Sequence, residues 1–517
     1  MSDPQRTINP WLIAVAVMFA TFMEVLDTTV VNVSLPHIAG SLSVTIDEAT
    51  WALTSYLVAN AIILPMTGWL ASVFGRKNLL MISVVGFTAA SFLCGLAPTL
   101  SMLIVFRVMQ GATGGALQPL SQAVLLEAFA PQDRGKAMGF WALGIVVAPI
   151  LGPVLGGWLT DNYSWRWVFY INIPVGIASI VMTKLYIFDP PYLRSENRNV
   201  DYWGIGMLVV GIGALQIVLD KGQQEDWFES NLIVMLAIIS AVTLIALVWH
   251  ELTTDDPIVD LRVLKERSYA VGVFLMTVVG FVLYGSMVLL PIMLQTLLGY
   301  PPLQAGIAMA PRGIGSFFMM PLTGLMTGKF DPRKLLTAGL IVGGTTLIWL
   351  SWLNLQAGYW DIFWPQLIQG VGMSLLFVPL TTISMDRIPR EKMGYATSLF
   401  NLMRNIGGSV GIASTGTMLA RHSQSTTSVL GSNVTAYNPA AQSMLAQMQG
   451  AFMAAGADAV TASQRAYAAM FGMVQREATM VSFVVIFQLM GWIFIGLVPL
   501  ILLMKRPKAG GGPVSAH

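Results

Sequence analysis

The sequence predicts an all-α integral membrane protein with two six-helix bundles in parallel repeat and two further helices inserted between them. Three observations lead to this fold class. The 517 residues are 55% hydrophobic and only 10% charged, whereas soluble proteins carry about 25% charged residues. Many apolar stretches are long enough to cross a bilayer, and short motifs of the first part of the chain recur in the second. The net charge of +2 gives no indication of nucleic-acid binding.

The apolar stretches give the order of the elements. A helix needs about 20 residues to cross the hydrocarbon core of a bilayer. We expect the first stretch to be a retained span, because it is too long and too acidic for a cleaved signal peptide. Fourteen spans are predicted, at 11–33, 49–71, 79–97, 100–123, 137–158, 166–188, 203–219, 231–250, 270–292, 303–326, 335–356, 360–383, 394–420 and 479–504.

The connections between these spans alternate in basic content. The connections and tails on the side of the N-terminus hold 20 of the 28 Lys and Arg residues. Short loops rich in Lys and Arg stay in the cytoplasm. We therefore expect both termini to be cytoplasmic, which requires an even number of spans.

The chain repeats itself at a nearly constant offset of 256 to 260 residues. Such a repeat predicts two halves of the same orientation, as in large transporters. The expected parts are a first bundle at 11–188, a linker with two inserted spans at 189–268, and a second bundle at 269–504. The repeated pairs are PMTGWL (65–70) with PLTGLM (321–326), GRK (75–77) with PRK (332–334), MQG (109–111) with IQG (368–370), and PL (119–120) with PL (379–380).

One long connection, 421–478, is predicted on the outer side. It begins with polar residues and continues as Ala-, Met- and Gln-rich sequence with helical spacing. We expect one or two amphipathic helices lying over the outer mouth. The segment is either a solvated connector or a docking surface for a periplasmic partner.

Two acids lie within the first apolar stretch. A charge at the centre of a membrane helix costs about 2.5 to 3.5 kcal/mol on insertion scales, so such residues usually face a partner or a water-filled cavity. At 100° per residue, an arc of about 140° contains five polar side chains of this helix. They are Thr21, Glu24, Asp27, Thr28 and Asn32.

Arg107, in the fourth span, is expected to lie at a similar depth to Asp27. A pair between them would remove most of the cost of burying either charge. One interpretation is a proton site whose affinity changes with conformation, and the alternative is a fixed structural ion pair. Glu24, one turn away, favours the first interpretation, because a static pair does not require a second acid.

Other polar and aromatic side chains in the spans are candidates for a substrate cavity. Arg312 and Arg404 lie in the second half, where they either bind anionic groups or fix helix packing. The neutral candidates are Asn32, Tyr56, Gln110, Gln118, Tyr284, Gln366, Gln369, Phe377, Asn401 and Asn405. For each amide the alternative is a hydrogen bond between helices, since polar groups in lipid need partners. For each aromatic ring the alternative is packing.

Several classes of function have no support in the sequence. No GxxxxGK[ST] motif for nucleotide binding and no HExxH or GxSxG motif of hydrolases is present. The four histidines are scattered, and we expect no metal site. A single cysteine excludes an intrachain disulfide. We therefore do not expect an enzyme.

Six ordered motifs resemble the major facilitator superfamily, and within it the fourteen-helix drug/proton antiporters. The resemblance covers essentially the whole chain. The motifs are LDTTVVNVSLP (26–36), LIVFRVMQGATGG (103–115), GPVLGG (152–157), WRWVFYINIPVG (165–176), MAPRG (309–313) and SLFNLMRNIGGSVG (398–411).

The resemblance implies roles for particular residues. Asp27 is similar to the acid of the first-helix motif, and Gly152, Pro153, Gly156 and Gly157 are similar to the antiporter motif of the fifth span. The loop after the second span, GWLASVFGRK (68–77), contributes Gly68, Gly75 and Arg76 to an inner gate. The family has an acid where this chain has Ser72, so we expect Arg76 to act with Glu127 instead.

The function implied by the resemblance is export of diverse hydrophobic or amphipathic drugs across the inner membrane, driven by the proton gradient and without a cofactor. It also implies a membrane-fusion adaptor and an outer-membrane channel as partners, besides drugs and membrane lipid. The alternatives are an exporter of one dedicated metabolite and a sensor or scaffold subunit without transport.

Overall fold

The structure is a computed structural model that describes residues 9–189, 200–435 and 437–505, without the side chains at positions 150, 153, 302 and 303. Residues 190–199, near the start of the expected linker 189–268, lie outside the described residues. The predicted boundaries of the three parts stay predictions.

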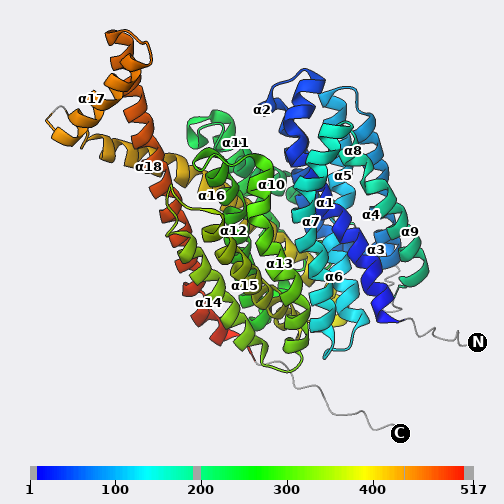
Figure 1. Cartoon of the computed structure of the whole chain (residues 1–517). Coiled ribbons are helices and arrows are strands. Elements are labelled where there is room, and N and C mark those ends of the chain that lie inside the picture. The colour runs from blue at the N-terminus through cyan, green and yellow to red at the C-terminus, as the bar shows by residue number, and fades with distance from the viewer. Residues whose placement is uncertain (1–8, 190–199, 436, 506–517) are drawn as a thin grey trace, which may run out of the picture.

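Helices make up the molecule, and most of them run side by side along one axis (Figure 1). The first half contains α1 (Pro10–Leu42), α2 (Ile46–Ala49), α3 (Trp51–Phe74), α4 (Arg76–Leu96), α5 (Leu100–Gly114), α6 (Leu117–Ala128), α7 (Arg134–Asn162), α8 (Trp167–Tyr170) and α9 (Asn172–Tyr186). The inserted segment contains α10 (Tyr202–Lys221), η2 (Trp227–Glu229), α11 (Asn231–Thr253) and η3 (Leu261–Lys265). The second half contains α12 (Arg267–Thr296), α13 (Pro302–Thr327), α14 (Pro332–Leu350), α15 (Tyr359–Met385), η4 (Arg390–Lys392), α16 (Met393–Gly431), α17 (Pro439–Ala454), α18 (Ala459–Gly496) and η5 (Val498–Leu503).

Each predicted span consists mostly of helix, but four are interrupted, and the eleventh extends beyond the end of α14 at Leu350. The second is broken between α2 and α3, the fourth between α5 and α6, the sixth between α8 and α9, and the last between α18 and η5. By length and composition, ten helical segments of the described chain are apolar enough to cross a membrane, and an eleventh if the two arms of α7 count as one. The long helices below this threshold include α13 and α16, which contain Arg312 and Arg404.

The internal repeat is visible in the packing. In the first half α1 packs on α7 and α3 on α5, and in the second α12 packs on α16 and α13 on α15. Two glycines allow the α3–α5 and α13–α15 crossings. A Cβ on Gly111 would lie 2.3 Å from the carbonyl oxygen of Tyr56, and a Cβ on Gly370 would lie 2.0 Å from that of Arg312. Gly111 and Gly370, and likewise Tyr56 and Arg312, are separated in the sequence by the offset of the repeat. This equivalence supports two halves of common origin.

The halves meet along two seams, which we call the α3/α16 seam and the α7/α13 seam. At the end of the bundle where the described chain begins and ends, glycines bring the backbones into contact. A Cβ on Gly68 would lie 2.7 Å from the amide nitrogen of Tyr395, and a Cβ on Gly324 would lie 2.6 Å from the carbonyl oxygen of Gly135. No side chain fits at such separations, so the halves are fully closed at this end.

The inserted helix α10 lies on the α3/α16 seam and is bonded to both halves. On the first half, Lys221 Nζ donates to Thr50 Oγ1 at 2.6 Å. On the second half, Gln216 Nε2 donates to Ser409 Oγ at 3.1 Å. The inserted pair is therefore part of the contact between the halves rather than an appendage.

The segment 421–478 differs from the expected helices over the outer mouth. The helices α16 and α18 continue without a break past their apolar stretches, and α17 packs on α18. Together they form an arm that projects away from the bundle, at the end opposite the described ends of the chain (Figure 1). The prediction of helix is confirmed and the prediction of their position is wrong.

Candidate functional site

Asp27 lies at the centre of a buried polar cluster in the first half. Its side chain is fully buried, and both carboxylate oxygens accept hydrogen bonds. Oδ2 accepts from Arg107 Nη1 at 2.6 Å, and Oδ1 accepts from Gln110 Nε2 at 2.9 Å and from Asn172 Nδ2 at 2.7 Å. The predicted pairing of Asp27 with Arg107 is confirmed. Three donors, one of them charged, offset the cost of burying this acid.

Arg107 is held from several sides. Its Nε donates to the carbonyl oxygen of Ala52 at 2.9 Å, and Nη1 also donates to Gln110 Oε1 at 2.7 Å. The guanidinium carbon lies 4.2 Å from the ring centre of Tyr56, within the range of a cation–π interaction. Tyr56 and Gln110, two of the substrate-cavity candidates, are buried in this cluster.

Glu24 lies one turn before Asp27 and has a different environment. It is 4% exposed. Its Oε1 accepts a hydrogen bond from Asn60 Nδ2 at 2.9 Å, whereas Oε2 has no hydrogen-bond partner among the described residues. An unpartnered oxygen on a buried acid is costly while the acid is charged. Glu24 is therefore much less constrained than Asp27.

Polar contacts join the two halves next to Glu24. Arg404 Nη2 on α16 donates to Gln118 Oε1 on α6, and Asn401 Nδ2 donates to Gln122 Oε1 at 2.6 Å. Arg404 and Gln118 both interact with Glu24. The electrostatic interaction of Arg404 with Glu24 therefore crosses the interface between the halves.

The remaining cavity candidates are spread over the second half and the outer end of α1. Gln366 Nε2 donates to Gln369 Oε1 at 3.3 Å, and both side chains are buried. Asn32 is exposed, while Tyr284, Arg312, Phe377 and Asn405 are partly buried. These residues do not converge on one site with Asp27.

The antiporter motif lies where α7 bends. The two arms of α7, Arg134–Pro149 and Val154–Asn162, meet at 40°. Gly152 and Gly156 face α1, where a Cβ would lie 2.1 Å from Thr29 Oγ1 and 2.9 Å from the carbonyl oxygen of Val30. Gly157 has open space around it, and the side chain of Pro153 lies outside the described residues. The motif therefore brings the helix with Glu24 and Asp27 close to α7.

The inner-gate residues form two separate contacts. Arg76 Nη1 and Glu127 Oε2 form the expected ion pair, but both belong to the first half. The contact between the halves at this level is that of Gly68 with Tyr395. The ion pair therefore stabilises the first half and is not part of the contact between the two halves.

Four residues of these sites were missed from the sequence. Asn60, Gln122 and Asn172 are neutral amides whose partners lie far away in the chain. Asp189 accepts from the backbone nitrogen of Lys77 at 2.8 Å, and its carboxylate packs against Gly75, where φ is +79°. Asp189 thus supplies an acid at the loop in which Ser72 replaces one.

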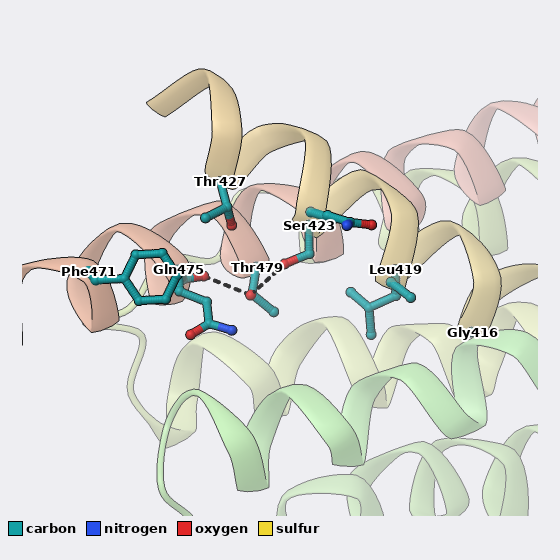
Figure 2. Close-up of a pocket in the computed structure, with 9 residues that line it drawn as sticks. Gly416, Leu419, Ser423, Thr427, Phe471, Gln475 and Thr479 are labelled. Atoms are coloured by element: carbon teal, nitrogen blue, oxygen red, sulfur yellow. Dashed lines mark hydrogen bonds between the residues drawn. The ribbon is translucent and has the colours of Figure 1, made fainter. Parts of the chain in front are cut away.

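A hollow of about 430 Å³ lies between α16 and α18, at the base of the arm (Figure 2). Ser423 and Thr479 bond to each other across it at 2.8 Å, and Phe471 and Gln475 lie at one end. Its lining contains no charged residue and none of the predicted site residues. We therefore do not assign it to the buried polar cluster.

We expect the substitution Asn172→Ala to weaken the cluster around Asp27. It removes one of two donors to Oδ1, and loss of a hydrogen bond to a charged buried group costs about 1.5 to 3 kcal/mol. Thermal unfolding of the purified protein in detergent would show a lower midpoint. Asn162→Ala, on the exposed end of α7, is the control and should leave the midpoint unchanged. Equal midpoints for the two variants would contradict this role of Asn172.

Most of the chain matches one known protein family. The family description "Major Facilitator Superfamily" matches residues 17–412. Among solved structures, the human organic anion transporter MFSD10 (TETRAN) superposes with a TM-score of 0.59, covering 94% of this chain and 100% of that one. At 10% identity, this likeness concerns the fold alone.

Several proteins of similar length are related in sequence. Multidrug export protein EmrB of Escherichia coli (strain K12) is 39% identical over 98% of both chains. Multidrug export protein EmrB of Haemophilus influenzae is 43% identical over 84% of this chain and 86% of that protein. Fatty acid resistance protein FarB of Neisseria gonorrhoeae is 38% identical over 95% of this chain and 96% of that protein.

Proposed function

Because this chain belongs to the major facilitator superfamily, we propose that it is a proton-driven antiporter that exports diverse hydrophobic or amphipathic drugs. The relatives named as multidrug exporters support the substrate class. Proton coupling is proposed from the site. The observation that carries it is the pair of buried acids, Glu24 and Asp27, one turn apart on a helix of the first half.

The two-half fold allows these acids to be exposed first to one side of the membrane and then to the other. Transporters with two repeats move substrate by rocking one half against the other around a site near the bilayer midplane. The two seams end in glycine contacts at one end of the bundle, so this structure is closed there. With that end in the cytoplasm, protons enter the first half from the outside and leave to the inside after the halves have rocked.

The proposal also includes the location of the protein, its orientation and its partners. We place the protein in the inner membrane, with both termini in the cytoplasm and the arm of α16, α17 and α18 in the periplasm. The resemblance to drug/proton antiporters suggests a membrane-fusion adaptor and an outer-membrane channel as partners. The arm is the part of the chain that extends farthest toward them (Figure 1).

A second candidate is an exporter of a narrower set of compounds. The similarity to a protein named for fatty acid resistance supports it. The second half also carries two arginines within spans, Arg312 and Arg404, and such charges suit substrates with a carboxylate. The two candidates differ in substrate range and share the coupling site.

Transport by the purified protein in liposomes tests the proposal. We expect an imposed pH gradient, acidic on the outer face, to drive uphill movement of a fluorescent amphipathic drug together with proton flow in the opposite direction. A matched set of dodecanoate, dodecanol and dodecylamine would then separate a broad from a narrow substrate range. Drug movement that ignores the pH gradient would refute proton coupling, and no movement of any compound would favour a sensor or scaffold.

A further inference from the structure

We propose that Glu24 of the first half and Arg404 of the second half form a latch that a proton releases. Ionised Glu24 attracts Arg404 and keeps the closed end of the two seams together. Neutralisation of Glu24 removes this attraction and lets that end open. The inference rests on the proposed function and assigns its coupling step to one acid, with Asp27 and Arg107 as a fixed pair.

Asp27 is hydrogen-bonded within the first half only, so its contacts do not change when the halves move relative to each other. Its partners come from α5 and α9, and the helix that carries it is α1, so the whole cluster belongs to the first half. Rocking of the halves as rigid bodies leaves these distances unchanged. Protonation of Asp27 would also remove an acceptor from a buried arginine, which leaves an uncompensated charge.

The bonding of Glu24 is incomplete within its own half. Asn60 donates to one carboxylate oxygen and Gln118 of the same half also interacts with Glu24, but Oε2 is buried without a hydrogen-bond partner among the described residues. Native proteins rarely leave a buried acid in this condition. The missing stabilisation comes from a charge that lies on the other half.

Arg404 supplies that charge from across the interface. It interacts electrostatically with Glu24, its Nη2 donates to Gln118, and its Nε has no partner among the described residues. The titratable and charged groups that face Glu24 are Asp27 on α1, Tyr56 on α3 and Arg404 on α16. Arg404 alone moves relative to Glu24 when the halves separate.

The direction of coupling follows from this arrangement. A proton from the outer phase binds a Glu24 carboxylate oxygen and leaves a neutral acid, which no longer attracts Arg404. The closed end then parts, the proton leaves to the cytoplasm, and a drug enters. The restored charge on Glu24 draws Arg404 back and closes the same end with the drug inside. One proton thus moves inward for each outward step of the drug.

Spin labels across the closed end test the latch. The exposed residues Gln132 and Lys329 lie on opposite sides of the α7/α13 seam, and Gln132→Cys with Lys329→Cys provides one label on each half. We expect Glu24→Gln and Arg404→Gln each to shift the ratio of open to closed distances about tenfold toward open, within the usual range of coupling between sites. Arg404→Lys keeps the charge and should keep the wild-type distances.

The double variant separates a latch from two independent effects. Because both single variants break the same attraction, Glu24→Gln with Arg404→Gln should shift the ratio no further than either alone. Glu225→Gln, on an exposed turn, is the control and should have no effect. Unshifted distances in Glu24→Gln, or additive shifts in the double variant, would overturn the latch. The labels report on the latch even if the drug transport assay fails, so the two proposals fail separately.

Discussion

Asp27→Asn is expected to abolish proton-driven drug export. The substitution removes the charge that pairs with Arg107, which is fully buried and 2.6 Å away. Removing one partner of a buried ion pair costs about 3 to 5 kcal/mol, because the other charge stays buried alone. Asparagine keeps only one acceptor oxygen, so its NH2 group would face either Arg107 or the two donors Gln110 and Asn172.

Uphill transport in liposomes under a pH gradient measures this effect, and equilibrium binding of the same drug gives a second readout. We expect transport at the background level while drug binding stays measurable. Asp47→Asn makes the same change on an exposed residue and is the matched control. Full transport by Asp27→Asn would show that the buried pair of Asp27 and Arg107 is not required for transport.

Gly324→Val is expected to prevent closure of the α7/α13 seam and thereby to stop transport. A Cβ on Gly324 would lie 2.6 Å from the carbonyl oxygen of Gly135 and 3.0 Å from the Cα of Lys136. These are backbone atoms, so the contact cannot be relieved by a change of side-chain rotamer. Overpacking of this kind costs about 1 to 3 kcal/mol, which disfavours the closed arrangement specifically.

Drug efflux from cells that make equal amounts of each variant measures this effect. Gly306→Val provides the control on the same helix, because a Cβ on Gly306 would have nothing within 4 Å. We expect efflux to be lost in the first variant and kept in the second. If both variants export the drug equally well, the glycine contact is not required for the transport cycle.

The sequence predicts the architecture well because the bilayer imposes a simple rule. Each span needs a long apolar run, and each predicted run consists mostly of helix. The pairing of Asp27 with Arg107 was also predictable, since a charge in a span needs a partner of opposite sign. Only one arginine of the first half lies at the right depth.

The amide partners could not be predicted in the same way. Asn60 and Asn172 carry no charge, and an amide within a span has many possible partners. The same ambiguity applies to Tyr56 and Gln110, which are cavity candidates by residue type and pack around Arg107 in the structure. The position of the arm depends on α16 and α18 continuing beyond the membrane, and helical spacing alone does not give their direction.

The placement of α10 has a consequence for how the molecule divides during motion. The repeated halves are equivalent, but α10 is bonded to Thr50 of one and Ser409 of the other, on one seam only. A single helix cannot follow two bodies that rotate apart. In the proposed rocking motion, one of these sets of bonds must exchange partners, so the two sides of the transporter meet unequal resistance although their sequences repeat each other.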